Sequence, residues 1–286
     1  MLLFIGLPII SSFFQSLHIE PEQILMEVEK CDPFGCKTET KVDIEATTKL
    51  QEEQPLGRFN GLGTYGDRNH LAFDEIKEAW TNSSSIAEFT DILLNLPFYK
   101  ALLFTLTFCF AVTPPVVVLG FIVALSVNTI TKSLKGPTIF GVILPMIVTP
   151  LIGSLVLFWM IDAKGILGSF IQFLFDDPNL SLKSSSQLTW ITLIIYGIWH
   201  NTPFAFVVFY AALQTVPQDP IEAAIIDGAS RYERVRHIVI PHLYPVATFI
   251  ILICLMDNFR VLEPIIGFAA EGVAQSLSWM IYNDLR

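Results

Sequence analysis

The sequence predicts an all-helical protein that crosses a membrane several times. Hydrophobic residues fill 52% of its 286 positions, and the mean hydropathy is +0.56. Only 15% of the residues are charged, whereas a soluble domain carries roughly 25%. Several apolar runs also approach or exceed the ~20 residues that a membrane helix needs. Together these observations indicate a polytopic membrane protein.

The net charge of −10 does not describe the whole surface. The acidic residues are concentrated between Glu20 and Asp91, so most of the negative charge belongs to one segment outside the membrane. We therefore expect no nucleic-acid partner, because such a partner requires a basic surface.

The first element is the apolar segment 1–17, which is slightly short for a span. We interpret it as the outer part of a first transmembrane helix that begins outside this sequence; a short complete helix is the alternative. Residues 18–97 form a polar insert, with short helices expected at Ile76–Trp80 and Ile86–Leu94. A connection of this length is uncommon without structure of its own, so we expect a small cap or a partly folded subdomain.

Residues 98–286 form the core, in which four apolar spans follow one another. We predict them at 98–130, 137–161, 188–213 and 241–266, with a further helix beginning at Ser276. Pro114 and Pro115 should kink the first span, and the segment from His200 to Pro203 should break the third. Including the incomplete first and last helices, the fold has about six.

Short basic loops predict the orientation, because Lys and Arg mark the cytoplasmic side. One loop contains Lys132 and Lys135, and a second contains three arginines between Arg231 and Arg236. Two spans separate these loops, so they share a side. We place both loops in the cytoplasm, so the insert 18–97 lies outside; in a bacterium, where the membrane is the inner membrane, that side is the periplasm. In that oxidising space a Cys31–Cys36 disulfide is expected, with two free thiols as the alternative.

The most informative segment is the polar stretch 216–241, which lies between two apolar spans. Asp219 and Glu222 have the spacing of a capping box, with Pro220 at the first helical position. Gly228 should end that helix in the left-handed conformation, and Ser230 with Glu233 should cap a second helix. The first helix carries small and apolar residues although it faces water, which indicates a protein partner.

This stretch resembles the EAA loop of ABC importer permeases. The matching residues are Glu222-Ala223-Ala224, then Gly228, then Ile238-Val239-Ile240-Pro241. The one departure is Ile240, where the family usually has leucine. Pro217 and the segment Asp227–Ser230 are similar to the sugar-importing branch. The resemblance extends from Phe59 onward, and it includes Phe98–Leu102, Thr105, Trp199–Ala212 and Asp257–Phe259.

The resemblance implies a type I importer core that works by alternating access. Its partners would be ABC ATPase subunits, a second permease chain, a periplasmic solute-binding protein and the lipid bilayer, and its solute would be a sugar. ATP and Mg²⁺ would bind only to the ATPase subunits, and this chain would hold no cofactor or metal. Six residues would carry the ATPase contact: Glu222, Ala223, Ala224, Asp227, Gly228 and Arg231.

The sequence does not predict an enzyme. A P-loop needs Gly-x-x-x-x-Gly-Lys-Ser/Thr, in which the lysine reaches the phosphates and the hydroxyl binds Mg²⁺. Gly136 and Gly141 have the glycine spacing, but Val142 replaces the lysine. We therefore expect ATP hydrolysis in separate subunits.

Polar residues at membrane depth form the candidate solute pathway, because they are costly unless they face a cavity or one another. By resemblance to the maltose-type permeases, Trp199, Asn201 and Phe204 match a segment that faces the sugar, and Asp257 and Asn258 lie near a second. Structural roles are the alternative. Asn201 and Thr202 would then satisfy backbone groups freed by Pro203, and Asp257 would pair with Arg260.

Three other functions remain open. An importer for a non-sugar solute such as glycerol phosphate shares the whole pattern. A secondary carrier would also have broken helices and polar residues at midplane, but it would not need the EAA loop. An intramembrane enzyme would need a nucleophile with a base, and His200 has no evident partner in the sequence.

Overall fold

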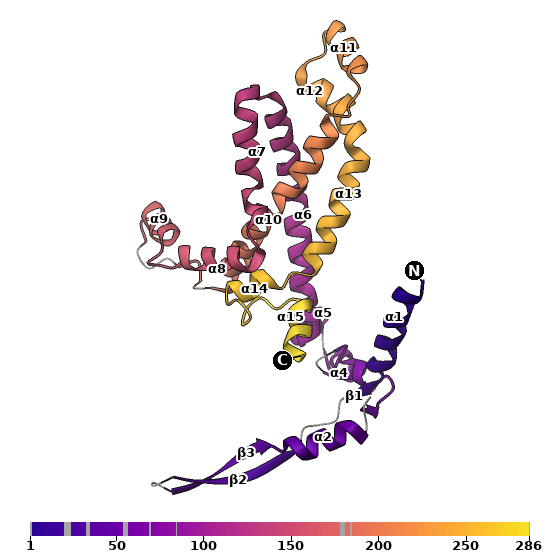
Figure 1. Ribbon diagram of the computed structural model, residues 1–286, viewed down its shortest axis with the longest axis vertical. Helices are drawn as coiled ribbons and strands as arrows, with labels where there is room; N and C mark the ends of the chain where they lie inside the picture. The colour runs from indigo at the N-terminus through magenta and orange to yellow at the C-terminus, as the bar shows by residue number, and fades with distance from the viewer. Residues whose placement is uncertain are drawn as a thin grey trace. The chain divides into compact units, whose positions relative to one another are not determined.

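The computed structural model describes residues 2–19, 24–32, 35–53, 57–68, 70–83, 85–177, 181–183 and 185–285. The chain divides into two compact units, Met1–Tyr99 and Lys100–Arg286 (Figure 1). The polytopic helical fold is confirmed: in the described ranges three helices are long and apolar enough to span a membrane, and a bent pair could supply a fourth span.

The N-terminal unit is mixed, since it contains two small antiparallel sheets that the sequence analysis did not predict. β1 pairs with β4 and β2 pairs with β3. The helices expected near Ile76 and Ile86 are confirmed as α4 and α5. The elements are α1 (Leu2–Ser16), β1 (His18–Ile19), β2 (Leu25–Asp32), β3 (Gly35–Val42), α2 (Ile44–Glu53), β4 (Arg58–Phe59), α3 (Gly63–Gly66), α4 (Phe73–Asn82) and α5 (Ile86–Asn95).

The β2–β3 hairpin places the backbones of Cys31 and Cys36 directly opposite each other. Their side chains lie outside the described part of the structure, so the disulfide stays a prediction. The remaining two cysteines, Cys109 and Cys254, are buried free thiols.

The C-terminal unit is helical, and its core contains the predicted spans. Its elements are α6 (Pro97–Thr129, which begins in the first unit), α7 (Lys132–Ile147), α8 (Pro150–Met160), α9 (Ile166–Phe175), α10 (Ser186–Leu213), α11 (Gln218–Ile226), α12 (Arg231–Arg234), the π-helical turn η1 (Val235–Val239), α13 (Ile240–Phe259), α14 (Glu263–Gly267) and α15 (Leu277–Asp284). Within this unit α11 and α12 lie at one end of the bundle, and α8, α14 and α15 lie at the other (Figure 1).

The span expected at 137–161 is two helices, α7 and α8, bent by 95°. Val148 and Thr149 adopt extended conformations at the break, with ψ of 128° and 143°. The cause is Pro150, because a proline disfavours helical backbone at the residue before it and suits the first position of a new helix. The predicted span is therefore broken at Pro150, and the two helices make one span only if the bent pair is counted together.

Three other prolines lie inside continuous helices. The predicted break at Pro203 is wrong, because helix α10 passes through it without a break. Helix α6 likewise continues through Pro114 and Pro115, and the kink predicted there stays a prediction. Close packing of these two helices supports them: a Cβ added at Gly120 of α6 would lie 2.5 Å from the Ala205 Cβ of α10. Small residues permit this approach between membrane helices, and tertiary contact then outweighs the local cost of proline.

An ion pair between Lys183 and Asp162 stabilises the segment that follows α8. Lys183 Nζ lies 3.0 Å from Asp162 Oδ2 and 3.3 Å from the centre of the Phe158 ring. The hydrogen bond from Lys183, aided by the Lys164 backbone N–H, holds the pKa of the Asp162 carboxyl below its ordinary value. The pair is therefore charged at neutral pH, and protonation of Asp162 in acid would remove it.

Candidate functional site: the hairpin at one end and the polar cavity at the other

The hairpin 216–241 begins with α11, which starts at Gln218 with Pro217 as its N-cap. The predicted Asp219–Glu222 capping box is therefore wrong. Pro217 holds the extended backbone that an N-cap needs, with φ −61° and ψ 135°, so the helix starts before Asp219. Asp219 instead lies in the first turn, where a carboxylate stabilises the positive end of the helix dipole.

The end of α11 has the predicted glycine geometry. Gly228 has φ +80°. Its N–H bonds to Ile225 O at 3.1 Å, and the N–H of Ala229 bonds to Ala224 O at 2.9 Å. These two bonds form a Schellman motif, which satisfies carbonyls that the helix end would leave free. The bend is thus fixed by local chemistry at one residue.

The second half of the hairpin also follows the prediction, because Ser230 and Glu233 form a reciprocal capping box. The helix then continues from Arg231 to Phe259. It widens to a π-helical turn at Val235–Val239, where Ile240 N–H bonds to Val235 O. Pro241 follows directly and has no N–H to donate, so the wider turn accommodates it without a break.

The residues predicted to meet the ATPase lie at the free end of the bundle. Glu222, Ala223, Asp227, Gly228 and Arg231 are exposed and Ala224 is half-buried. Their roles stay predictions. Ile226 is 86% exposed and Ile225 is 52% exposed. Apolar side chains exposed beside small alanines form a surface suited to close protein contact.

Towards the other end, three spans are joined by a buried chain of polar side chains. Asn201 Nδ2 of α10 donates to Asn258 Oδ1 of α13 at 3.0 Å, and Asn258 Nδ2 donates to Thr113 Oγ1 of α6 at 3.1 Å. Asn258 is 2% exposed and Thr113 is 4% exposed. Since buried polar groups are costly when unpaired, this amide chain specifies how the three helices meet.

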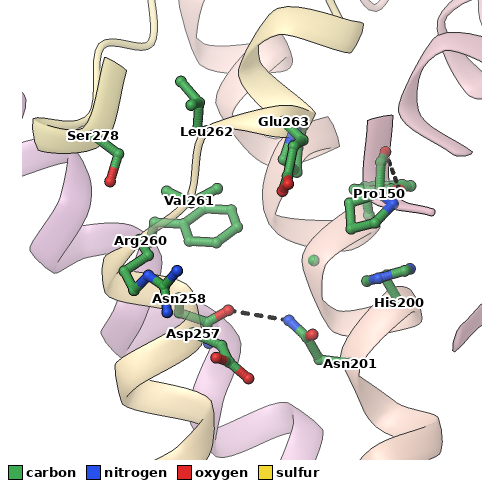
Figure 2. Close-up of a pocket in the computed structure, with 14 residues that line it drawn as sticks. Pro150, His200, Asn201, Asp257, Asn258, Arg260, Val261, Leu262, Glu263 and Ser278 are labelled. Atoms are coloured by element: carbon green, nitrogen blue, oxygen red, sulfur yellow. Dashed lines mark hydrogen bonds between the residues drawn. The ribbon is translucent and has the colours of Figure 1, made fainter. Parts of the chain in front are cut away.

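A cavity of about 470 Å³ lies beside the amide chain. Figure 2 shows its polar lining, with side chains of α13 and the segment after it on one side and those of α10 on the other. The polar groups are Tyr196, His200, Asn201, Asp257, Asn258, Arg260, Glu263 and Ser278, and the remaining lining residues include Phe108, Pro150 and Pro264. The cavity combines an aromatic ring, amides, carboxylates and a guanidinium.

The structure brings together three of the five predicted pathway residues. Asn201, Asp257 and Asn258 line the cavity. Trp199 does not; it lies on the outer side of α10 and is 47% exposed. Phe204 packs against the hydrophobic core. Their roles in solute contact stay predictions.

The structural alternatives for these residues are not met. Pro203 leaves the Trp199 carbonyl without its helical partner, but Thr202 Oγ1 donates to the Ile198 carbonyl at 2.6 Å and the Asn201 amide donates to Asn258. Between the described side chains of Asp257 and Arg260 there is no ion pair. The carboxylate of Asp257 therefore lines the cavity, and the amide of Asn258 takes part in the amide chain.

Sequence reasoning missed several contributors, among them Thr113 and Glu263. The span predicted at 241–266 ends at Phe259, and Glu263 begins the short helix α14. Charged residues at 257, 260 and 263, followed by Pro264, were a signal that the apolar helix stops earlier. Thr113 had no such signal, because a single threonine in an apolar helix usually bonds to its own backbone.

Comparisons with known proteins define the family. Residues 86–262 match the family described as binding-protein-dependent transport system inner membrane component. The trehalose/maltose transport system permease protein MalF of Thermococcus litoralis is 34% identical over 115 residues, which cover 36% of this chain and 39% of that protein. The sn-glycerol-3-phosphate transport system permease protein UgpA of Escherichia coli is 29% identical over 146 residues, which cover 50% of this chain and 49% of that protein. The chain thus spans less than half the length of these curated relatives.

A solved structure supports the fold. A bacterial alginate ABC transporter, in complex with an alginate pentasaccharide-bound periplasmic protein, matches with a TM-score of 0.54 and 18% identity, over 73% of this chain and 72% of that one. At this identity the likeness concerns the fold alone. With the family match covering most of the helical unit, this multi-pass membrane protein belongs to the family of binding-protein-dependent transport system inner membrane components.

Proposed function

We propose that this chain is the permease subunit of an ATP-driven, binding-protein-dependent importer that carries a carbohydrate across a bacterial inner membrane by alternating access. The observation that carries the proposal is the connection between the hairpin and the cavity. Helix α10 runs from Asn201 towards the hairpin, and the helix from Arg231 to Phe259 returns to Asn258. Movement of α11 would therefore reach the Asn201–Asn258 contact through two continuous helices.

In this mechanism α11 docks on an ABC ATPase subunit, which binds ATP and Mg²⁺. Ala223 and Ala224 permit close approach, Glu222 and Arg231 meet charges of the partner, and Asp227 and Gly228 fix the bend. When the ATPase pair closes, α10 and α13 change their crossing and open the cavity outward. Solute delivered by a periplasmic binding protein then enters, and hydrolysis returns the inward-facing state. This chain would bind no cofactor and would not be an enzyme.

The proposed topology places residues 216–241 in the cytoplasm and residues 18–97 in the periplasm. Its support is that α11 and the start of α7, which carries Lys132 and Lys135, lie at the same end of the bundle (Figure 1). Positive charge at that end favours a cytoplasmic location. A second permease chain would complete the pathway, and the exposed Trp199 on the outer side of α10 suits contact with it or with solute.

The cavity lining favours a neutral polyhydroxy solute. The lining contains two carboxylates, Asp257 and Glu263, and one guanidinium, that of Arg260, so it carries more negative than positive charge and would repel a strong anion. Amides and carboxylates suit the hydroxyl groups of a sugar, and the rings of Phe108 and Tyr196 suit its apolar face. A glycerol phosphate remains the second candidate, supported by the similarity to the UgpA proteins and by Arg260.

The test is affinity purification of the tagged protein from its own membranes, followed by mass spectrometry of the bound proteins. We expect an ABC ATPase and a second permease in the eluate, and the associated binding protein can then be screened with sugars and glycerol phosphate. A protein that purifies alone even after mild cross-linking would overturn the importer proposal and favour a secondary carrier.

Deletion of residues 20–55 is expected to weaken docking of the binding protein about tenfold, while ATPase assembly stays unchanged. The two ends of this deletion lie close together, because β1 pairs Ile19 with Arg58 and the Asn60 N–H donates to Leu17 O at 2.9 Å. A short Gly-Ser linker should therefore close it without disturbing this pair of strands.

The measurement is surface plasmon resonance of the binding protein on the purified complex. The matched control replaces the same residues with an unstructured linker of equal length. If the wild type, the deletion variant and the linker control bind the solute-binding protein with equal affinity, the insert is only a spacer.

A further inference from the structure

A second cavity, separate from the first, lies beside the hairpin and has a volume of about 690 Å³. It is bounded by the ends of α6 and α10, by the start of α11, and by the turn from Arg231 to Val239. Because α6 and α10 are long and apolar enough to span a membrane, a cavity at their ends would lie where the bundle leaves the bilayer.

Positive charge dominates this cavity. Arg231 and Arg234 both line it, and none of its described lining residues is an Asp or Glu. The nearest acid in the sequence, Glu233, uses its carboxylate to accept the Ser230 backbone N–H at 2.7 Å. The two guanidinium groups are therefore not neutralised by the walls of the cavity.

The buried side chain of Arg234 is a second feature that indicates a ligand site. Its Nε is fully buried, and within the described residues no acceptor bonds to it. A buried charged donor without an acceptor is costly. An anion with several oxygens would relieve this cost, because guanidinium groups bind phosphate through paired hydrogen bonds.

The remaining lining is amphiphilic. Asn128 and Gln218 add amide groups, while Leu213, Val216 and Val239 form a buried apolar wall. We propose that this cavity binds a phosphate group, and that the apolar wall makes an anionic phospholipid its source rather than a free phosphate. The headgroup would lie on Arg231 and Arg234, where at Arg231 it would take the place of the proposed ATPase contact, and its acyl chains would continue along α6 and α10 into the bilayer.

Such a lipid would touch both α11 and the ends of two spans. It would thus brace the hairpin against the bundle, at the place where the proposed function needs a rigid connection. The inference rests on the proposed function only for this consequence and for the side of the membrane; lipid binding itself is measured without transport or ATP.

The experiment incorporates the tagged full-length protein, with whatever subunits it retains, into vesicles of equal parts phosphatidylglycerol and phosphatidylcholine. After gentle extraction, native mass spectrometry counts the lipids held by each protein. We expect the wild type to retain phosphatidylglycerol about tenfold over phosphatidylcholine, and the double variant R231Q/R234Q to lose this preference. Arg236→Gln is the matched control, because Arg236 lies on the same turn but does not line the cavity, and it should behave as wild type.

A second arm titrates the extracted protein with inorganic phosphate. Displacement of phosphatidylglycerol only at high phosphate concentration supports a lipid site; phosphate binding that needs Arg231 and Arg234 without any lipid preference supports a free phosphate as the source. Equal retention of both lipids by the wild type, without arginine-dependent phosphate binding, would overturn the proposal. The lipid retention of the wild type is measured without any variant, so misfolding of a variant cannot affect it. Loss of a bound ATPase in R231Q/R234Q, with unchanged lipid retention, would instead assign the arginines to a protein contact.

Discussion

Replacing Gly228 with valine is expected to leave the protein in the membrane and to reduce solute uptake at least about tenfold. The reason is backbone conformation alone. Gly228 has φ +80°, and a Cβ at this position would meet no atom within 4 Å. A left-handed conformation costs a residue with a side chain about 1–2 kcal/mol, and a β-branched residue is especially unfavourable there. The Schellman bonds at the end of α11 should break, and α11 would no longer be held at a fixed angle to the spans.

Gly136→Val is the matched control for this prediction. A Cβ at Gly136 also meets no atom within 4 Å, and its φ lies outside the left-handed region. Uptake in membrane vesicles, normalised to the amount of inserted protein, separates coupling from folding. Normal uptake by Gly228→Val would contradict the role given to the hairpin.

Replacing Asn258 with leucine is expected to lower the thermal unfolding midpoint by several degrees and to abolish most uptake. Asn258 donates to Thr113 and accepts from Asn201, so leucine would leave both partners without their bond. A buried polar group left unpaired costs about 1–3 kcal/mol. The three helices that meet at the cavity would then lose the contact that specifies their packing.

Two comparisons test this explanation. Asn283→Leu changes an exposed asparagine of α15 in the same way, and it should leave the unfolding midpoint within about a degree. Thr113→Val combined with Asn258→Leu should cost less than the sum of the single changes, because the partners are removed together. Additive losses would show that the two residues act independently.

The hairpin could be predicted from sequence because local chemistry determines it. The left-handed Gly228, the Ser230–Glu233 box and the surrounding charges all act within a few residues. The same local reasoning was wrong for Asp219, because the preceding Pro217 supplied an N-cap without any side-chain bond. It was also wrong for Pro203, because the packing of α10 against α6 depends on contacts far apart in sequence.

The cavity could be predicted only in part. Asn201, Asp257 and Asn258 were visible as polar residues in apolar runs. Thr113 and Glu263 join them through the crossing of α6, α10 and α13 and through the early end of α13, neither of which a sequence pattern encodes. The β2–β3 hairpin of the N-terminal unit was missed because its strands are rich in charged residues, which weakens the alternation of apolar and polar positions.

Site-directed cross-linking tests the central claim, that α11 is the contact through which an ATPase drives this chain. Ile226→Cys places a thiol at the end of α11, where the side chain is 86% exposed, and Phe173→Cys places one on α9, where it is 82% exposed. With a short thiol-reactive cross-linker in native membranes, we predict a product containing the ATPase subunit from Ile226→Cys and none from Phe173→Cys. An ATPase product from Phe173→Cys, with none from Ile226→Cys, would contradict the proposed coupling.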